Sequence, residues 1–351
     1  MFSHDALSRI QPTDPRLMTQ AQARLDRLTK PLGSGGRLEE VAARYVMITG
    51  EMNPKVPHGV VFTFAADHGV TVEGVSAYPS AVTPQMVLNF LRGGAGVNVL
   101  ARHVGIEIRV VDIGVAFDFE DAPGLIHKKI MPGTKNLLVE SAMSSAQAEQ
   151  ALQVGIDLAT EAAQEGIGLI GTGEMGIGNT TASSAITAVV TRRPVFEVTG
   201  RGTGIDDASH ARKIDVIQRA LAFHRLDSSD AMKVLVKVGG LEIGGLAGLM
   251  LGAAAARIPV VLDGFIAGAA ALIAVGLQPR CRDYLIASHR SVERGHQAIL
   301  DHLDVKPLFD LDLRLGEGTG ACLGMSLVLA AVKILTEMAT FDEAGVSERE
   351  R

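Results

Sequence analysis

The sequence is poor in aromatic residues and in cysteine. Only 4% of its 351 residues are Phe, Trp or Tyr, and none is Trp. This composition suits tightly packed helices on a sheet better than an all-β sandwich. The two cysteines, Cys281 and Cys322, lack the neighbours of a metal or redox motif and are too few for a disulfide scaffold. We therefore expect a protein of a reducing compartment.

Excess positive charge and long apolar runs are also absent. The net charge of -6 leaves no electrostatic footprint for nucleic acid. The most apolar stretch, residues 241–256, carries Glu242, is interrupted by glycines and is too short to span a bilayer. The N-terminus does not read as a basic and then apolar signal segment. We expect a cytoplasmic protein without a nucleic-acid or membrane partner.

Short apolar runs alternate with helical patterns, which predicts a parallel α/β fold. Hydrophobic residues make up 47% of the chain, and its length suffices for a large domain plus a smaller part. The predicted strands are residues 60–66, 106–111, 167–170, 259–262 and 284–287. The predicted helices are residues 21–28, 38–48, 84–91, 97–103, 146–165, 182–190, 210–223, 240–256 and the stretch up to 338 that follows residue 321. Residues 116–144 show no clear periodicity.

Polar residues follow these apolar runs or stand in glycine-rich turns. They are Asp67, Asp112, Glu174, Asp263, Ser288 and Glu317. In an open parallel sheet such loops gather at the carboxyl edge, where ligands bind. For Asp112 we favour a helix cap, but six caps are a poorer explanation than a shared site.

The most informative stretch is residues 171–181, GTGEMGIGNTT, which predicts a strand, a glycine turn and a helix start. Such a turn favours an anion, because free N–H groups and the helix dipole point at it. Gly171, Gly173 and Gly176 fit the dinucleotide motif G-x-G-x-x-G, with Glu197 as the ribose ligand. A P-loop is disfavoured, because Asn179 replaces the phosphate-binding lysine. In a chain with 39 glycines, a tight turn without a ligand stays a third alternative.

A series of segments in order along nearly the whole chain resembles the family of nicotinate-nucleotide:dimethylbenzimidazole phosphoribosyltransferases. The segments are 28–31 (LTKP), 65–69 (AADHG), 75–79 (VSAYP), 171–181, 237–242 (KVGGLE), 262–265 (LDGF), 288–289 (SH) and 314–321 (RLGEGTGA). One departure is Gly35, in the segment of residues 33–37 (GSGGR), where the family usually has leucine in G-S-L-G-R. It affects the packing of that loop rather than the chemistry.

The resemblance implies transfer of phosphoribose from nicotinate mononucleotide to 5,6-dimethylbenzimidazole, without a cofactor. It also implies a Rossmann-like open parallel sheet flanked by helices, formed by residues 59–321. Residues 1–58 and 322–351 would form a small helical domain. The protein would be a homodimer in which this domain completes the partner's site, and Glu317 would be the catalytic base.

Chemistry supports these roles independently. When one ring nitrogen of a benzimidazole attacks the ribose C1′, the other must lose its proton, and Glu317 between Gly316 and Gly318 can approach a flat ring. The alternative is a first-turn glutamate stabilised by the helix dipole. An oxocarbenium-like transition state would be stabilised by nearby carboxylates, for which Glu174 is the first candidate and Asp263 the second.

The phosphate requires donors and a cation. Gly176, Asn179 and Thr180 can supply donors at the helix start, Gly202, Thr203 and Gly204 further N–H groups, and Lys213 the charge, although an ordinary solvated lysine is the alternative. Tyr78, Pro79 and Met86 could form an apolar slot with Gln85 bonding a ring nitrogen, or could simply pack the loop. Ser291, Leu315 and Gly316 complete the predicted substrate contacts.

No metal is expected, because the pair Asp67 and His68 has no third ligand at a telling spacing. Two other functions stay open at this point: an NAD-dependent oxidoreductase built on the glycine turn, and a non-catalytic nucleotide-binding protein. The first needs a hydride-transfer partner that the sequence does not reveal. The second does not require a carboxylate framed by glycines at Glu317.

Overall fold

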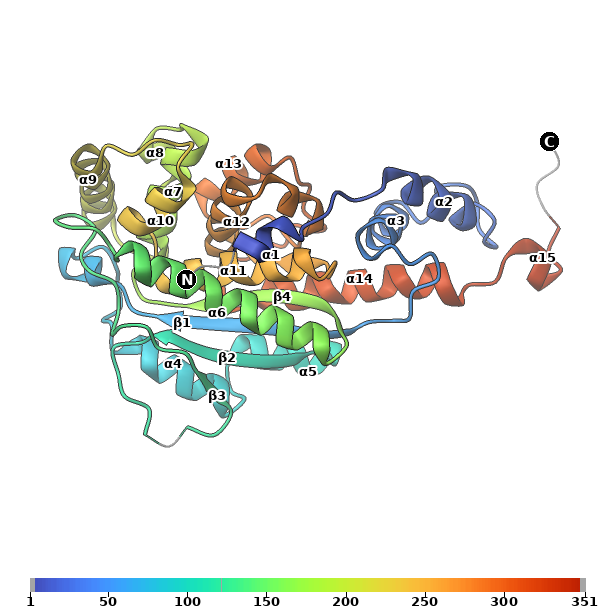
Figure 1. Cartoon of the computed structure of the whole chain (residues 1–351), viewed down its shortest axis with the longest axis horizontal. Coiled ribbons are helices and arrows are strands. Elements are labelled where there is room, and N and C mark those ends of the chain that lie inside the picture. The colour runs from blue at the N-terminus through green and yellow to red at the C-terminus, as the bar shows by residue number, and fades with distance from the viewer. Residues whose placement is uncertain (1–3, 121, 348–351) are drawn as a thin grey trace.

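The computed structural model of the protein describes residues 4–120 and 122–347, a mixed α/β structure (Figure 1). Its strands are β1 (His58–Ala66), β2 (Glu107–Gly114), β3 (Leu125–His127), β4 (Ile167–Met175), β5 (Val260–Leu262) and β6 (Leu285–Ala287). Its helices are α1 (His4–Ser8), α2 (Pro15–Leu25), α3 (Arg37–Thr49), α4 (Val82–Leu91), α5 (Gly96–Val104), α6 (Ser145–Gln164), α7 (Asn179–Thr191), α8 (Val195–Val198), α9 (Asp207–His224), α10 (Ala231–Val238), α11 (Leu241–Ala255), α12 (Phe265–Leu277), α13 (Arg294–Leu303), α14 (Thr319–Glu337) and α15 (Phe341–Ala344). Two 3₁₀ helices, η1 (Gly69–Glu73) and η2 (Pro279–Tyr284), complete the set.

All six strands form one parallel sheet in the order β3-β2-β1-β4-β5-β6. This is the order of the doubly wound dinucleotide-binding fold, in which the chain reverses its direction of winding between two neighbouring strands. Here the reversal lies between β1 and β4. The predicted Rossmann-like sheet is therefore confirmed, and ligands are expected where the carboxyl ends of these strands meet.

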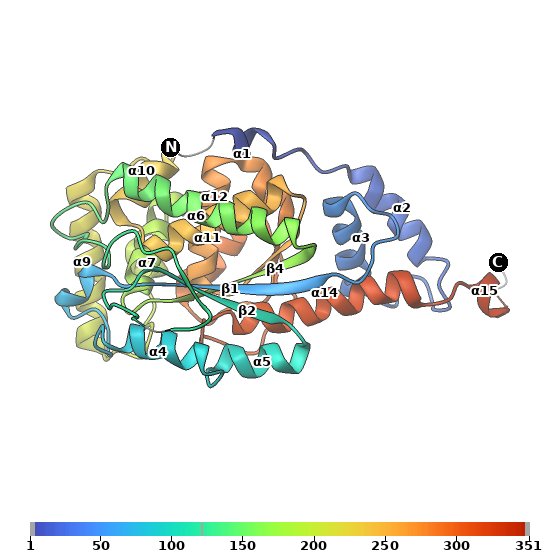
Figure 2. The same cartoon turned by 60° about the horizontal axis from the view of Figure 1, so that its bottom comes forward.

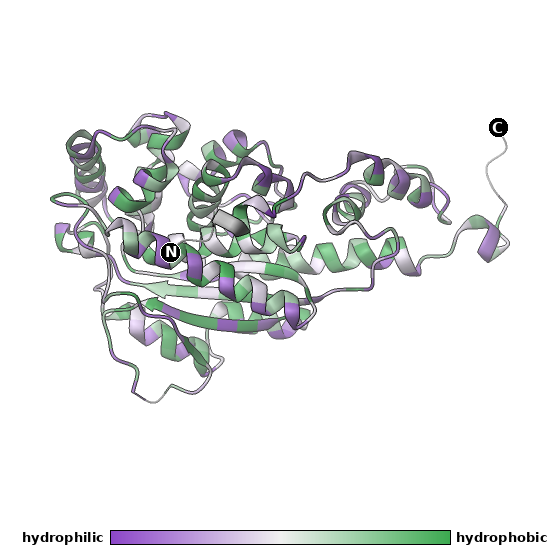
Figure 3. Ribbon diagram, in the orientation of Figure 1, coloured by the Kyte–Doolittle hydropathy of each residue, from purple (hydrophilic) through white to green (hydrophobic). Residues whose placement is uncertain are grey.

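Helices cover both faces of the sheet (Figure 2). On one face α11 packs against the strands and is covered by α6 and α12; α4, α5 and α14 lie on the other. In β1, Phe62 and Phe64 face one hydrophobic cluster, whereas Val61 and Ala65 face the other. Successive side chains of a strand point to opposite faces, so a strand buried on both sides is a continuous apolar run. The central strands and α11, α12 and α14 are accordingly mostly hydrophobic in Figure 3.

The N-terminal helices α2 and α3 meet the C-terminal helix α14 to one side of the sheet, whereas α1 packs on α11. There α2 and α3 pack against the second half of α14 (Figure 1). The first half of α14 packs on β4 and β5, so one helix crosses the predicted boundary after residue 321. Buried residues of α2 and α3 also share a cluster with Val61 and Ala65 of β1. A separate small domain is thus not confirmed, and its boundaries stay a prediction.

Among the described residues, α14 is also the one helix whose length and composition would suit a membrane span. Just over half of it is buried within the protein, against the sheet and α3.

Most predicted elements exist, with ends shifted by a few residues. The apolar helix α12 escaped prediction, because it is buried around nearly its whole circumference and has no amphipathic period. The helices α10 and α13 and the short helices α1, α8 and α15 were also not predicted. In residues 116–120 and 122–144, which showed no clear periodicity in the sequence, β3 is the one helix or strand.

Candidate active site

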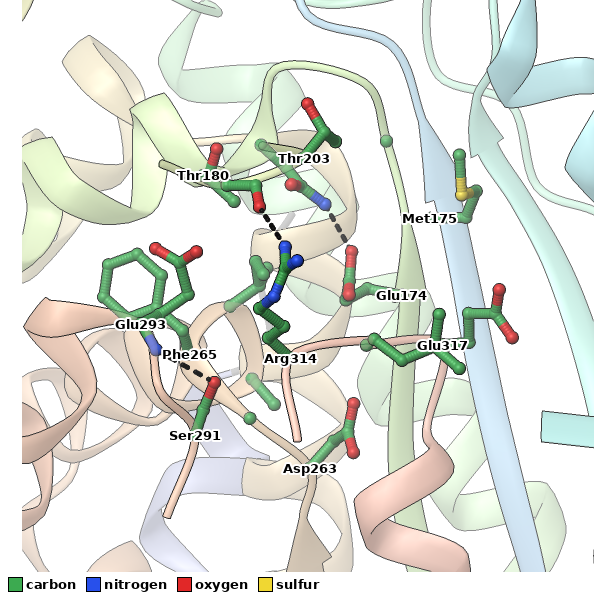
Figure 4. Close-up of a pocket in the computed structure, with 18 of the residues that line it drawn as sticks. Glu174, Met175, Thr180, Thr203, Asp263, Phe265, Ser291, Glu293, Arg314 and Glu317 are labelled. Carbon is green, nitrogen blue, oxygen red and sulfur yellow. Dashed lines mark hydrogen bonds between the residues drawn. The ribbon is translucent and has the colours of Figure 1, made fainter. Parts of the chain in front are cut away.

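A cavity of about 450 Å³ opens at the carboxyl ends of the central strands (Figure 4). Glu174 comes from the end of β4, Asp263 follows β5 and His289 follows β6. The segment before α14, residues 314–317, forms a further wall. The structure therefore brings together all three predicted catalytic carboxylates, Glu174, Asp263 and Glu317.

The glycine-rich stretch differs from the dinucleotide motif. Gly171 and Gly173 lie inside β4, paired with β1, rather than in a turn. A Cβ at Gly171 would lie 2.7 Å from Met325 Sδ, and one at Gly173 would lie 2.3 Å from the Glu317 carbonyl oxygen. These glycines allow the start of α14 to pass close over the strand. The interpretation as a dinucleotide turn is therefore wrong.

The turn itself consists of Gly176, Ile177 and Gly178, which has φ 98° and is the N-cap of α7. Gly178 has no capping side chain, but the N–H groups of Asn179 and Thr181 already donate to the carbonyl oxygens of Gly176 and Gly178, at 3.1 and 3.0 Å. The N–H of Thr180 is therefore the first-turn donor left for a ligand. Asn179 and Thr180 follow in the first turn and line the cavity. This arrangement supports the predicted anion site.

Glu174 is 6% exposed and accepts a hydrogen bond from Asn179 Nδ2. Burial raises its pKa to about 8, and the negative charges of Asp263 and Glu242 add to this effect. Near neutral pH this raised pKa favours the protonated form of Glu174. A cationic ligand beside it would favour ionisation.

Glu317 has φ 67° and stands between Gly316 and Gly318, whose φ values are 78° and 104°. Its carbonyl oxygen accepts from Thr63 Oγ1 at 3.1 Å, and its Oε2 accepts from the N–H of Val97 at 3.2 Å. The carboxylate thus lies at the first turn of α5, and Glu317 precedes α14 instead of forming part of its first turn. Burial raises the pKa of Glu317, while this backbone hydrogen bond opposes the effect.

Asp263 is engaged by the backbone. Its Oδ1 accepts from the N–H groups of Gly320 and Ala321 at 2.7 and 3.1 Å, and its Oδ2 accepts from that of Gly318 at 3.1 Å. His289 Nε2 lies 3.9 Å from Oδ1. Asp263 therefore fixes the start of α14, and with it the segment that carries Glu317, while its carboxylate still lines the cavity.

The anion side of the cavity has a buried cation behind it. Lys213 is 1% exposed and donates to Thr180 Oγ1 at 2.7 Å. Burial lowers its pKa to about 8. Its side chain is thus no solvated helix lysine. A Cβ at Gly202 would lie 3.4 Å from Lys213 Nζ. The absence of a side chain at Gly202 therefore leaves room for a ligand group beside Thr180 and the Lys213 ammonium.

Apolar side chains line the remaining wall: Tyr78, Val82, Met86, Met175, Ile177, Phe265, Ile266 and Leu315. Thr203, Ser291 and Gly316 also line the cavity, as predicted. Gly204 lies outside the lining, and Pro79 and Gln85 are exposed and lie outside it too. The predicted slot is therefore formed by Tyr78 and Met86 with other partners.

Sequence reasoning missed four polar or aromatic lining residues, namely Phe265, His289, Glu293 and Arg314. Arg314 points over the cavity and donates to the Gly202 carbonyl oxygen at 3.3 Å (Figure 4). Phe265, His289 and Arg314 lie within the segments that carry the family resemblance, which was the available signal. Glu293 had none.

The other carboxylates at strand ends have structural partners. Asp112 accepts from the N–H groups of Gly114 and Val115, which caps a loop rather than a helix. Asp67 accepts from the N–H of Ala116. Neither lines the cavity. Within residues 4–120 and 122–347, no cluster of three or more His, Cys, Asp or Glu side chains could hold a metal ion.

Comparison with known proteins agrees with this geometry. A family model described as "Phosphoribosyltransferase" matches residues 10–346. A Geobacter sulfurreducens protein named nicotinate-nucleotide–dimethylbenzimidazole phosphoribosyltransferase is 62% identical over 98% of both chains. A Chloroflexus aggregans protein of the same name is 61% identical over 98% of this chain and 97% of its own.

Solved structures show the same likeness. A crystal structure of the enzyme of that name from Thermus thermophilus has a TM-score of 0.89 at 47% identity, over 96% of this chain and all of its own. A structure of CobT from the same organism has a TM-score of 0.91 at 48% identity, over 95% and 100% of the two chains. The chain belongs to the phosphoribosyltransferase family that these enzymes represent.

Proposed function

We propose that this protein transfers 5-phosphoribose from nicotinate mononucleotide to 5,6-dimethylbenzimidazole. The products are α-ribazole 5′-phosphate and nicotinate, and the configuration at C1′ is inverted. One observation carries the proposal: a single cavity joins an anion site, backed by Lys213, to a cluster of three buried carboxylates. A ribose phosphate carries negative charge at its phosphate, which matches the anion site. It develops positive charge at C1′ during the reaction, which matches the carboxylates.

The phosphate fits the first turn of α7 and the Gly202 loop, with Lys213 as counter-charge. The ribose then extends toward Glu174, whose ionised form would stabilise both the pyridinium of the donor and an oxocarbenium-like transition state. The acceptor would occupy the apolar wall near Met86 and Leu315, beside Glu317.

In the reaction, the lone pair of one benzimidazole nitrogen attacks C1′ while the bond from C1′ to the nicotinate nitrogen breaks. The electron pair of that bond returns to the pyridine ring, which leaves uncharged at nitrogen. The proton on the acceptor's other nitrogen passes to a carboxylate oxygen of Glu317. Burial raises the pKa of this carboxyl, which makes it a stronger base than an exposed glutamate.

The two alternatives are less well supported. An oxidoreductase would use the dinucleotide turn, but Gly171 and Gly173 lie within β4. A non-catalytic nucleotide-binding protein would not require three carboxylates buried at its ligand.

The direct test is to incubate the protein with nicotinate mononucleotide and dimethylbenzimidazole without metal and to follow nicotinate by chromatography. We expect nicotinate and a new nucleotide in equal amounts. No nicotinate at high enzyme concentration would refute the proposal.

We also propose a cytoplasmic homodimer. The loop of residues 29–37 lies at the end of the molecule away from α7 and α9, and its Leu32 is 76% exposed (Figure 1). It is therefore suited to contact a partner's site rather than its own. Light scattering gives the oligomeric state, and a monomer at assay concentration would refute the dimer. Cell fractionation tests the location.

A further inference from the structure

The helix that receives the catalytic carboxylate has no capping side chain at its N-cap, although its Asn98 Oδ1 accepts from the N–H of the N-cap residue at 3.1 Å. The N-cap of α5 is Ala95, with φ -81° and ψ 166°, the extended conformation in which Ser, Thr, Asp or Asn normally caps a helix. Alanine has no oxygen to offer. The N–H of Val97, the second residue of the helix, instead donates to Glu317 Oε2 at 3.2 Å, from a residue 220 positions away.

This contact is enclosed. Ala95 is 3% exposed, Val97 is fully buried and Glu317 is 7% exposed, so water has little access to the N–H if the carboxylate withdraws. Gly96 brings the helix close, because a Cβ there would lie 2.8 Å from Leu315 Cδ2 and 3.3 Å from Glu317 Oε2. An unpaired buried donor is costly.

We propose that Ala95 is kept free of a capping oxygen so that the first turn of α5 binds and positions the carboxylate of Glu317. This inference rests on the proposed function, in which Glu317 is the base. The positive end of the helix stabilises the ionised carboxylate, which counteracts burial and neighbouring charge. Val97 and Ala95 are thus positioning residues, and neither lines the cavity.

Other groups close to Glu317 also affect the pKa of its carboxyl. Asp263, after β5, raises its pKa, and Glu174 of β4 approaches the same loop at Gly316. From α14, the Cys322 thiol lies 4.0 Å from the Val97 carbonyl oxygen, and burial raises its pKa to about 12, so it stays neutral. From β1, Thr63 contributes a hydroxyl.

The decisive variant gives α5 its own cap. In Ala95→Ser, the new hydroxyl competes with Glu317 for the Val97 N–H. Glu317 then loses a donor that favours its ionised form, so the acidic limb of kcat/KM for the benzimidazole should move up by about 0.5 to 1 pH unit. Ala95→Gly, which adds no oxygen, is the matched control and should leave the limb in place.

A thermal-unfolding cycle tests the cap without any assay of activity. Glu317→Ala leaves the Val97 N–H unpaired, so Ala95→Ser should raise Tm more in that background than in the wild type. Equal increases in both backgrounds, or an unmoved acidic limb in folded Ala95→Ser, would overturn the inference. Absence of nicotinate release by the wild type would instead refute the proposed function, and the unfolding cycle would still decide the capping.

Discussion

Lys213→Met should stabilise the ligand-free protein against unfolding and lower its affinity for nicotinate mononucleotide. Lys213 lies almost fully buried, with Thr180 Oγ1 as its hydrogen-bond acceptor. In the described part of the chain no carboxylate forms a salt bridge with Lys213, although the charge of Glu293 acts on it from farther away. Methionine fills nearly the same volume without the charge.

The size of the stabilisation follows from the lowered pKa of Lys213. Burial lowers the pKa of Lys213 from 10.5 to about 8. This difference means that the buried ammonium lowers the free energy of unfolding by about 3 kcal/mol, because each pKa unit corresponds to about 1.4 kcal/mol. The folded state disfavours the ammonium, so the cost is complete below pH 8 and disappears as the pH rises toward 10.5.

Removing the charge therefore recovers about 3 kcal/mol, less about 1 kcal/mol for the hydrogen bond to Thr180. A net gain of about 2 kcal/mol in a chain of 351 residues raises Tm by about 3 °C near neutral pH. The phosphate loses a charge-assisted hydrogen bond, so nicotinate mononucleotide should bind about 10 to 100 times more weakly. Nicotinate riboside, which lacks the phosphate, should be little affected.

Calorimetry gives Tm and affinity, and kcat/KM for the donor gives the pH dependence. In the wild type this value should fall above about pH 8, as Lys213 loses its proton, whereas Lys213→Met should lack this limb. Lys233→Met, at an exposed position, controls for lost surface charge. A Tm below that of the wild type, or equal loss of affinity for nucleotide and riboside, would refute the reasoning.

Three further predictions concern the carboxylates and the strand glycines. Glu317→Gln should slow turnover by a factor on the order of 100 or more while donor binding persists; an unchanged rate in a chromatographic assay would remove Glu317 as the base. Glu174→Gln should lower kcat and abolish the rise toward pH 8 of the wild-type kcat/KM for nicotinate mononucleotide, since burial raises the pKa of Glu174 to about 8; a profile like that of the wild type would contradict this role. Gly173→Ala should lower the free energy of unfolding by about 2 to 4 kcal/mol in denaturant titrations, because its Cβ would lie 2.3 Å from a carbonyl oxygen. Gly264→Ala, with its nearest contact at 3.5 Å, is the control and should lose far less; similar losses would exclude the clash as the cause.

Much of the fold could be predicted from local patterns. The strands are continuous apolar runs because both faces are buried, and helices such as α6 are amphipathic because one face meets solvent. Local patterns failed where the surroundings of an element in the fold, rather than a periodic pattern of apolar residues, determine its structure. The helix α12 is apolar all round, and β4 continues through glycines that sequence reasoning placed in a turn.

The site was predictable to a similar degree. Glu174, Glu317 and Thr180 came from motifs, and Lys213 came from its place after the glycines of residues 202–204 and from the family resemblance. The structure places all four at or directly behind one cavity. Pro79 and Gln85 were inferred from residue type alone, and the structure leaves them exposed outside the lining. Residue type shows which chemistry a side chain can perform, but it does not fix the direction in which that side chain points.

The sequence by itself determined the alternating α/β order, the anion-binding helix start and the family resemblance, because these depend on spacing along the chain. Only the tertiary structure decided the assignment of the carboxylates. Asp263 fixes the start of α14, while Glu317 reaches the uncapped end of α5. These contacts join residues tens to hundreds of positions apart, and their hydrogen bonds and burial exist only once the sheet has brought the strand ends together.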